Sequence, residues 1–439
     1  MTSAKSTIVA LSSGSLPSGV AVIRLSGPLS LCAAEALCGT LPTPRSLTLT
    51  ALTDPITGML LDKGMVAMFP APHSFTGEDC AELQVHGSPA GVRSILDVLT
   101  GMQGVELAGA GDFTRRAFEN GKLDLTAIEG LGDLLAAETE HQRRQAVSRL
   151  EGDLAAQILV WRDGLLAARA EIEAHLDFSD EDDVPFSLPD HFAQGLIDLK
   201  AALEAALAGF ERGRIVREGF RIVLAGAPNV GKSSLLNALA GSELAIVTPE
   251  AGTTRDTRDV AIDLGGRLVV LTDTAGLRET ESLAEAEGIR RARRAVAEAD
   301  LVLWLNAPDT ERVAVPSFEP HVPLWVIATK SDLEGASEGA DLALSARTGD
   351  GIGDLLKRLE SHIDTNLGTG EASLVSHLRD REAIAAAVAA IGDALDHIEH
   401  AELCAEDLRA ASEVLARLVG LIDSETVLDR LFAGFCIGK

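Results

Sequence analysis

Residues 226–233, Gly-Ala-Pro-Asn-Val-Gly-Lys-Ser, decide the fold of this chain. An apolar run precedes them and a run of good helix formers follows, which predicts a strand, a loop and a helix. Gly226 and Gly231 allow the backbone of the loop to curl until successive N–H groups face a phosphate chain. Lys232 can reach the terminal phosphates, and the Ser233 hydroxyl can ligate Mg²⁺. The stretch therefore predicts a phosphate-binding loop in a sheet of mostly parallel strands.

Three later segments predict that the nucleotide is GTP. An apolar strand runs into Asp-Thr-Ala-Gly at 273–276, whose carboxylate can hold the Mg²⁺ shell and whose last N–H can sense a γ-phosphate. A second strand delivers Thr-Lys-Ser-Asp at 329–332, where the Asp332 carboxylate can accept two hydrogen bonds from guanine. Adenine presents no such pair of donors. Ser-Ala-Arg at 345–347 then follows as the loop behind the base.

The base motif departs at one position from its usual form. The region resembles the translation-factor-like GTPases, in which the motif reads Asn-Lys-x-Asp, whereas this chain has Thr329 at the first position. A threonine lacks the side-chain amide of asparagine, so we expect modest affinity for the base. Guanine selectivity itself is expected to rest on Asp332.

The segment 247–256, Val-Thr-Pro-Glu-Ala-Gly-Thr-Thr-Arg-Asp, is predicted to be the first switch. Thr254 can ligate Mg²⁺ only when a γ-phosphate is present, and Gly252 supplies the hinge. Ser233 and Thr254 are thus the predicted Mg²⁺ ligands. The predicted GTP-binding residues are Asn229, Val230, Gly231, Lys232, Ser233, Ser234, Thr248, Pro249, Glu250, Ala251, Gly252, Thr253, Thr254, Asp273, Thr274, Ala275, Gly276, Thr329, Lys330, Asp332, Ser345, Ala346 and Arg347.

The group that positions the hydrolytic water is left open by the local sequence. Many related GTPases place a Gln directly after the Asp-x-x-Gly motif, but here that position is Leu277. The carboxylates that follow are Glu279, Glu281, Glu285 and Glu287. Acidic residues at a helix start also simply suit the helix dipole. For charge stabilisation, the Asn229 carbonyl can hold a monovalent cation, and Arg255 and Arg258 are alternative arginine fingers.

Composition limits the class of protein and its partners. The 439 residues carry 66 Asp and Glu against 38 Lys and Arg, a formal net charge of −28. Broad capture of a nucleic-acid backbone needs basic surfaces, so a local patch or a partner protein would have to supply them. Five Cys in no paired metal-binding pattern fit a reducing compartment. No apolar run approaches the length of a membrane span, so we expect a soluble, cytoplasmic protein.

The fold class expected is multidomain, with α/β and α parts. Residues 1–120 alternate short apolar runs with turns and predict an α+β domain, with strands near 8–11, 20–25, 65–69 and 81–85. Residues 121–215 and 371–439 share an Ala- and Leu-rich composition with helical spacing. They predict one discontinuous helical domain into which a Ras-like P-loop GTPase domain, 216–370, is inserted. A separate C-terminal helical bundle is the alternative.

Both ends of the chain resemble one family. The N-terminal region carries Phe-Thr-Gly-Glu-Asp at 75–79, Glu-Leu-Gln-Val-His-Gly at 82–87 and Asn-Gly-Lys-Leu-Asp-Leu at 120–125, and the chain ends in Cys-Ile-Gly-Lys at 436–439. Together with the inserted GTPase and its Ala-Gly-Thr-Thr-Arg-Asp loop, the whole chain resembles the MnmE/TrmE family of bacterial tRNA wobble-uridine modification GTPases.

The resemblance implies roles for several residues. In the N-terminal domain, which is similar to folate-binding domains and dimerises, the implied folate contacts are Arg24, Glu82, Lys122 and Lys439. Cys436 lies in the terminal motif and is a candidate for a direct chemical role. In the GTPase domain, K⁺ ligation is implied for Asn229, Thr248, Glu250 and Thr253. The resemblance also selects Glu285 among the four carboxylates as the catalytic, water-positioning group.

The implied reaction is a joint one. A homodimer of the chain would form a heterotetramer with the FAD- and NADH-dependent MnmG (GidA) subunit and act on tRNA. The pair would add an aminomethyl or carboxymethylaminomethyl group at carbon 5 of the wobble uridine, using 5-formyl- or 5,10-methylene-tetrahydrofolate. GTP hydrolysis, with Mg²⁺ and stimulated by K⁺ through dimerisation of the GTPase domains, would drive the cycle. The alternative is a regulatory switch, such as a ribosome-assembly GTPase, which predicts no folate binding and no need for Lys439.

Overall fold

The computed structural model describes residues 6–177, 190–246, 259–273, 295–311, 322–334, 339–368 and 373–422, together with 428, 431, 432, 435 and 438. The chain forms two compact units. The first comprises Met1–Gly132, Leu150–Arg162 and Ser412–Lys439, and the second comprises Asp133–Arg149 and Asp163–Ala411. The domain boundaries expected from the sequence stay a prediction. None of the helices in the described ranges is long and apolar enough to cross a membrane.

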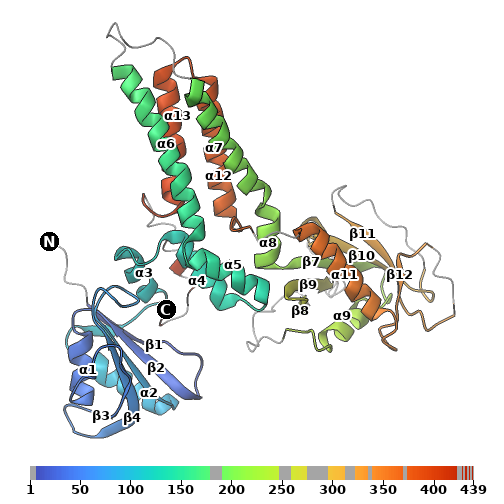
Figure 1. Ribbon diagram of the computed structural model, residues 1–439. Helices are drawn as coiled ribbons and strands as arrows, with labels where there is room; N and C mark the ends of the chain where they lie inside the picture. The colour runs from blue at the N-terminus through green and yellow to red at the C-terminus, as the bar shows by residue number, and fades with distance from the viewer. Residues whose placement is uncertain are drawn as a thin grey trace, which may run out of the picture. The chain divides into compact units, whose positions relative to one another are not determined.

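The first unit is built on a six-stranded sheet in the order β3-β4-β5-β2-β1-β6 (Figure 1). The strands are β1 (Thr7–Leu11), β2 (Ser18–Ser26), β3 (Thr48–Thr53), β4 (Leu60–Phe69), β5 (Cys80–Gly87) and β6 (Val105–Leu107). The helices α1 (Ser30–Cys38) and α2 (Pro89–Thr100) pack against this sheet and bury an apolar core around Ile23, Leu83 and Ile95. The predicted α+β architecture is confirmed.

Two strands of this sheet were not expected from the sequence. Strand β3 forms an edge, and only one of its six residues, Leu52, is buried, so it lacks the alternation of buried and exposed residues that marks a half-buried strand. Strand β6 has only three residues and pairs in parallel with β1. Neither segment carries a periodic pattern long enough to be recognised.

Helices make up the parts of the chain between the two sheets and after the second. They are α3 (Asp112–Glu119), α4 (Leu125–Ala136), α5 (Glu140–Leu150), α6 (Asp153–Asp177), α7 (Asp190–Ala208), α8 (Phe210–Glu218), α12 (Leu378–Asp396) and α13 (Ala401–Leu418). Helix α7 precedes the second sheet and α12 follows it, yet the two pack against each other (Figure 1). This packing is what an inserted GTPase domain requires.

The second sheet is six-stranded, in the order β12-β11-β10-β7-β9-β8. Its elements are β7 (Phe220–Gly226), α9 (Lys232–Ala240), β8 (Asp259–Leu264), β9 (Arg267–Asp273), β10 (Leu301–Asn306), β11 (Leu324–Ala328), β12 (Leu342–Ala343) and α11 (Ile352–Leu367). All neighbours are parallel except β8, which pairs antiparallel with β9. The carboxyl ends of β7, β9, β10 and β11 therefore meet at one edge, where ligands bind in open parallel sheets.

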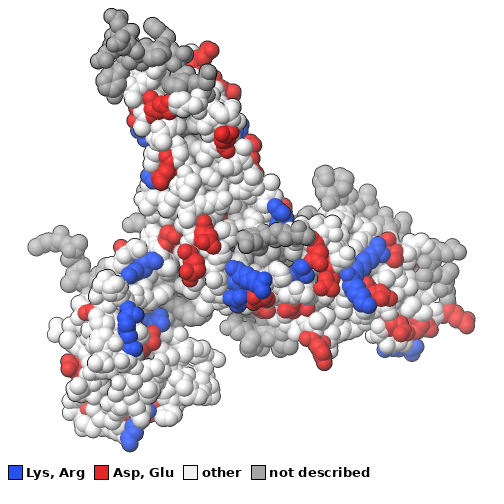
Figure 2. Space-filling model, in the orientation of Figure 1, with Lys and Arg blue, Asp and Glu red and all other residues white. Residues whose placement is uncertain are grey.

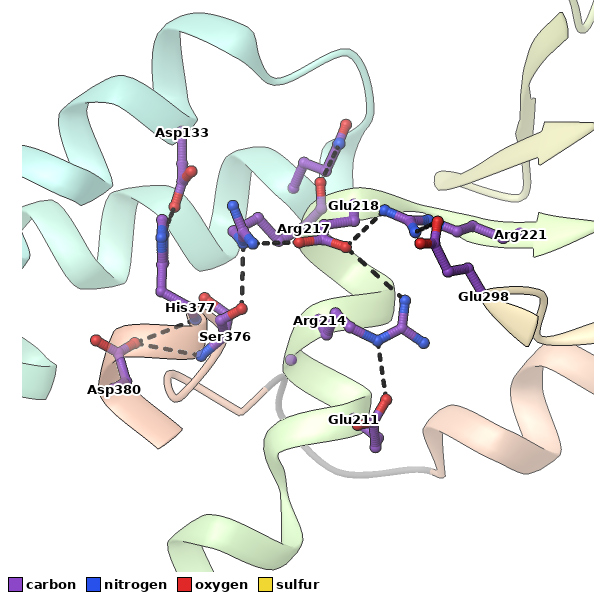
Figure 3. A network of polar contacts seen from close by, with 12 residues as sticks. Asp133, Glu211, Arg214, Arg217, Glu218, Arg221, Glu298, Ser376, His377 and Asp380 are labelled. Atoms are coloured by element: carbon purple, nitrogen blue, oxygen red, sulfur yellow. Dashed lines mark hydrogen bonds and ion pairs between the residues drawn. The ribbon is translucent and has the colours of Figure 1, made fainter. Parts of the chain in front are cut away.

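A polar network connects α8 to the segment before α12 and to strand β7, both in the second unit (Figure 3). The Arg217 Nε donates to the Ser376 carbonyl just before α12, at 3.2 Å. On the other side, Glu218 accepts a hydrogen bond from Arg221 of β7 at 2.9 Å. Arg214 forms an ion pair with Asp300, which precedes β10, at 2.5 Å. Helix α8 is thus joined by side chains to the helices and to the sheet.

Candidate nucleotide-binding site

The phosphate loop leaves the end of β7 through backbone conformations that the sequence supplies. Gly226 has φ of 139° and Gly231 has φ of 95°, and both values favour glycine. A Cβ on Gly226 would also lie 2.4 Å from the Leu305 carbonyl oxygen of β10. Asn229 adopts φ of 61°, a left-handed conformation that asparagine tolerates. The loop ends at the N-terminus of α9, where free N–H groups attract anions.

The Lys232 side chain is folded over this loop. Its ammonium donates to the Gly226 carbonyl at 3.0 Å and to the Ala227 carbonyl at 2.8 Å. The residue is only 6% exposed. A buried cation needs polar partners, and here the loop carbonyls hold it beside the position where phosphate oxygens would bind.

Two of the oxygen groups expected at Mg²⁺ lie together. The Ser233 hydroxyl donates to Asp273 Oδ2 at 2.6 Å, and Asp273 is buried at the end of β9. A hydroxyl and a carboxylate are hard oxygen groups that suit Mg²⁺, which also keeps water and phosphate ligands. The residues present therefore fit the ion. The other predicted ligand, Thr254, lies outside the described residues.

The carboxylate predicted to recognise the base is held by two neighbouring side chains. Asp332 Oδ1 accepts from the Ser345 hydroxyl at 2.6 Å, and Asp332 Oδ2 pairs with Arg347 at 2.6 Å. The hydrogen bond from Ser345 is the main cause that lowers the pKa of Asp332, so the carboxylate is ionised at neutral pH. Lys330, beside it, has φ of 52° and pairs with Asp309 at 2.6 Å. An ionised carboxylate can accept both donors of guanine.

Thr329 occupies a buried position between two strands and the phosphate loop. It is 3% exposed, and its hydroxyl lies 2.5 Å from the Val230 carbonyl oxygen and 3.0 Å from the Asn306 carbonyl oxygen. The motif at 329–332 indicates the amide that Thr329 lacks but gives no sign of this contact. Asn306 and Asp309 were not predicted, although residues that follow a parallel strand, as these do, often lie at a ligand site.

The remaining predicted nucleotide residues divide into two groups. Ser234 is exposed in the first turn of α9, and Ala346 is partly buried between Ser345 and Arg347. Outside the described residues lie Thr248, Pro249, Glu250, Ala251, Gly252, Thr253, Thr254, Thr274, Ala275, Gly276 and the predicted catalytic residue Glu285. Their roles stay predictions.

The N-terminal motifs converge in the first unit. Arg24 of β2 lies opposite Glu82 of β5, and their side chains pair at 2.9 Å. The Arg24 guanidinium also lies 5.3 Å from the ring centre of Phe75, a cation–π distance. The exposed Lys122 side chain lies beside Gly77, 3.4 Å from the position of an ideal Cβ there. Two sequence motifs thus meet at Arg24, and the third lies beside Gly77 in one of them.

The end of the chain returns to the same sheet. The Ser12 hydroxyl donates to the Gly438 carbonyl at 2.7 Å. Gly438 has φ of 94°, and a Cβ on it would lie 2.1 Å from the Leu11 carbonyl oxygen at the end of β1. Only a glycine fits so close an approach. Cys436 and Lys439 themselves lie outside the described residues.

Two family models match the chain over nearly its whole length. The model described as "GTP-binding protein TrmE N-terminus" matches residues 7–122, and the "MnmE helical domain" model matches residues 125–436. A protein named tRNA modification GTPase MnmE from Azorhizobium caulinodans is 48% identical over 100% of both chains. One of the same name from Rhizobium meliloti is 49% identical over 99% of both chains. A crystal structure of an Aquifex aeolicus Era variant bound to GDP and AlF4⁻ is 22% identical, covers 39% of this chain and 66% of its own, and has a TM-score of 0.26.

Proposed function

The chain belongs to the MnmE family of GTPases that modify tRNA, and we propose that its GTP hydrolysis drives modification of a tRNA wobble uridine. The observation that carries the proposal is the presence of two separate candidate sites in one chain. One places Lys232, Ser233, Asp273 and Asp332 at the edge of a parallel sheet. The other pairs Arg24 with Glu82 on the sheet that Gly438 contacts at the end of β1.

The first site binds and hydrolyses GTP. Asp332 reads guanine, and Lys232 with the N-terminus of α9 holds the phosphates. Ser233 and Asp273 would hold Mg²⁺, which neutralises charge on the phosphate oxygens. We assign the water-positioning role to Glu285 and K⁺ ligation to Asn229, Thr248, Glu250 and Thr253. The left-handed backbone at Asn229, which sets where its side chain departs from the loop, supports a special role for that residue.

The second site takes the folate. The cationic side chains of Arg24, Lys122 and Lys439 would bind the carboxylates of the folate's glutamate. The Glu82 carboxylate would accept hydrogen bonds from the N–H groups of the pterin ring. Strand β1 places Ala10 opposite Arg24, and the Gly438 segment lies at the end of that same strand. This arrangement of Arg24 and Gly438 on one sheet supports a folate role for the terminal motif that contains Cys436 and Lys439. A tetrahydrofolate derivative, either 5-formyl- or 5,10-methylene-, would supply the one-carbon unit.

The homodimer is supported by an apolar surface of the first unit. Five large apolar side chains are exposed directly before β3, on it, and from there to the start of β4, namely Leu47, Leu49, Ile56, Met59 and Leu60. Ile56 is 92% exposed. An exposed edge strand with apolar neighbours is a surface that a partner normally covers. We assign it to a second copy of the chain.

A partner protein would supply most of the surface that contacts tRNA. The net charge of −28 disfavours extensive phosphate contact, so most of the tRNA surface would lie on the FAD- and NADH-dependent MnmG (GidA) subunit of a heterotetramer in the cytoplasm. The product is a carboxymethylaminomethyl or aminomethyl group at carbon 5 of uridine.

One calorimetric experiment separates this function from that of a regulatory switch. The intact chain and a chain without its last four residues are titrated with 5-formyltetrahydrofolate. We expect binding only by the intact chain. Failure of the intact chain to bind would favour a switch that acts without folate. The modified-nucleoside profile of tRNA from a deletion strain then tests the product.

A further inference from the structure

We propose that Arg116 and Asn120 of α3 are positioning residues for the folate site. They hold residues 75–79, the segment that leads into β5, so that Phe75 lies against the Arg24 guanidinium and orients it toward a carboxylate of the ligand. These roles rest on the proposed folate function and deepen it, because both residues act on Arg24 without contacting the ligand.

One side of α3 faces the candidate folate site. Phe113, Arg116 and Asn120 follow one another at spacings of three and four residues, and Asn120 is the C-cap of the helix. Residues at these spacings lie on the same side of an α-helix. Phe113 is fully buried, and its ring centre lies 5.9 Å from the guanidinium carbon of Arg24. The side of α3 that carries Arg116 and Asn120 is therefore turned toward Arg24.

Arg116 holds the segment through the side chain of Glu78. Its Nη1 donates to Glu78 Oε2 at 2.8 Å and to the Ser26 carbonyl at 3.2 Å, and its Nη2 donates to the Ser6 carbonyl at 2.8 Å. The Ser26 hydroxyl donates to the same Glu78 oxygen at 2.9 Å. The Arg116 and Glu78 side chains are only 11% and 16% exposed, so water weakens this charge-assisted bond little. Arg116 therefore ties Glu78 to the end of β2 and to the residue before β1.

Asn120 holds the same segment two residues earlier. Its side-chain amide donates to the Thr76 carbonyl at 2.6 Å. Gly77 lies between the two points of attachment and has φ of 78°, which favours glycine. A Cβ on Gly77 would lie 3.0 Å from Asn120 Cβ, so the segment packs closely on the end of α3. Since Phe75 directly precedes Thr76, the backbone next to its ring is fixed.

The place of Phe75 matters because its ring lies against Arg24. The ring centre is 5.3 Å from the guanidinium carbon, a distance at which the cation is attracted to the ring. Glu82 Oε1 accepts from Arg24 Nε at 3.0 Å and pairs with Nη2 at 2.9 Å. Within the described part of the chain, no acceptor bonds to Arg24 Nη1. The ring and the carboxylate thus fix the guanidinium, and its Nη1 can donate to a carboxylate of the ligand.

Calorimetric titration of the full-length chain with 5-formyltetrahydrofolate tests these roles. We expect affinity to fall about tenfold in Arg116→Met and in Phe75→Ala, and about threefold in Asn120→Ala, which loses one neutral hydrogen bond. Arg93→Met, which removes an exposed arginine of α2 in the same unit, should bind as the wild type does. GDP affinity, measured on every variant, should stay within about twofold, because the nucleotide site belongs to the second unit.

Double variants separate positioning from a merely structural role. In the Phe75→Ala background, adding Arg116→Met or Asn120→Ala should lower folate affinity by less than about twofold, because the ring through which they act is already gone. A residue that only stabilises the fold would act independently of Phe75, and the two losses would then multiply. The cycle therefore tests the path from α3 to Arg24 directly.

Two results would overturn the positioning role while the folate function stands. They are wild-type affinity in Arg116→Met and Asn120→Ala, and losses that multiply in the double variants. If Arg116→Met does not fold, Asn120→Ala gives the same comparison, because Asn120 is exposed and its helix cap uses the backbone N–H. Failure of the wild type to bind 5-formyltetrahydrofolate would instead remove the folate function, and the positioning role with it.

Discussion

The Ser233 hydroxyl and the Asp273 carboxylate lie 2.6 Å apart in a hydrogen bond that joins the start of α9 to the end of β9. Asp273 is 1% exposed. Two elements that the sequence separates by 40 residues are thus held at the spacing at which both can reach one hydrated Mg²⁺ ion.

Removal of the Ser233 hydroxyl should uncouple the nucleotide from Mg²⁺. We expect Ser233→Ala to lower GTP hydrolysis by about a hundredfold or more, since metal ligation stabilises the transition-state charge. GDP binding should become nearly insensitive to Mg²⁺. The measurement is phosphate release and GDP titration with and without the ion. Ser242→Ala, at the other end of α9, is the matched control. A variant that kept its Mg²⁺ dependence would exclude Ser233 as a ligand.

The hydrogen bond from Ser345 keeps the pKa of Asp332 below its usual range, and this has a consequence for pH. Guanine recognition needs the ionised form, which is present above the folded-state pKa and is lost as pH falls through it. GDP affinity of the wild type should therefore be flat from neutral pH down to the ordinary pKa of aspartate, about 3.9. In Ser345→Ala the decline should begin at higher pH. Coincident pH profiles of the two proteins would show that Ser345 does not act on this carboxylate.

A buried ion pair fastens α5 to the start of α12. Arg149 Nη1 and Asp380 Oδ2 lie 2.7 Å apart, and both side chains are 0% exposed. Loss of one partner leaves the other charged and buried, so Arg149→Met should cost about 3–5 kcal/mol in the free energy of unfolding. Urea titration followed by circular dichroism measures this cost. The control is Arg144→Met, whose exposed pair with Glu140 should contribute at most about 1 kcal/mol. Equal losses in the two variants would contradict the assignment.

The end of α12 should show a stability that depends on pH. His397 Nδ1 lies 2.8 Å from Asp407 of α13, and this hydrogen bond raises the pKa of His397. A raised histidine pKa gives stability that is complete below the unfolded-state value of about 6.5 and is lost as pH rises through the folded-state value. As pH rises through this range, the melting temperature of the wild type should therefore fall more than that of His397→Gln. Parallel melting curves across that pH range would rule out the coupling.

The local motifs of the nucleotide site were predictable because their chemistry is local. The loop at 226–233 needs glycines, a lysine and a hydroxyl at fixed spacing, and the structure places Lys232 over the loop and Ser233 beside Asp273. The sequence likewise indicated the two motifs that contain Asp332 and Ser345, and the structure joins these side chains by a hydrogen bond. By contrast, β3 and β6 could not be predicted, because an edge strand with exposed side chains and a three-residue strand have no burial pattern.

By itself, the sequence determined the fold class, the family resemblance and the order of the nucleotide motifs, since all of these depend on residue types at short spacing. Only the tertiary structure decided which distant groups meet. Thr329 bonds to Val230 across 99 residues, Arg149 to Asp380 across 231, and Ser12 to Gly438 across 426. No periodicity encodes such contacts, because they arise when sheets and helices pack and each buried polar group must find a partner. The tertiary structure thus showed that the threonine of the base motif reaches the phosphate loop.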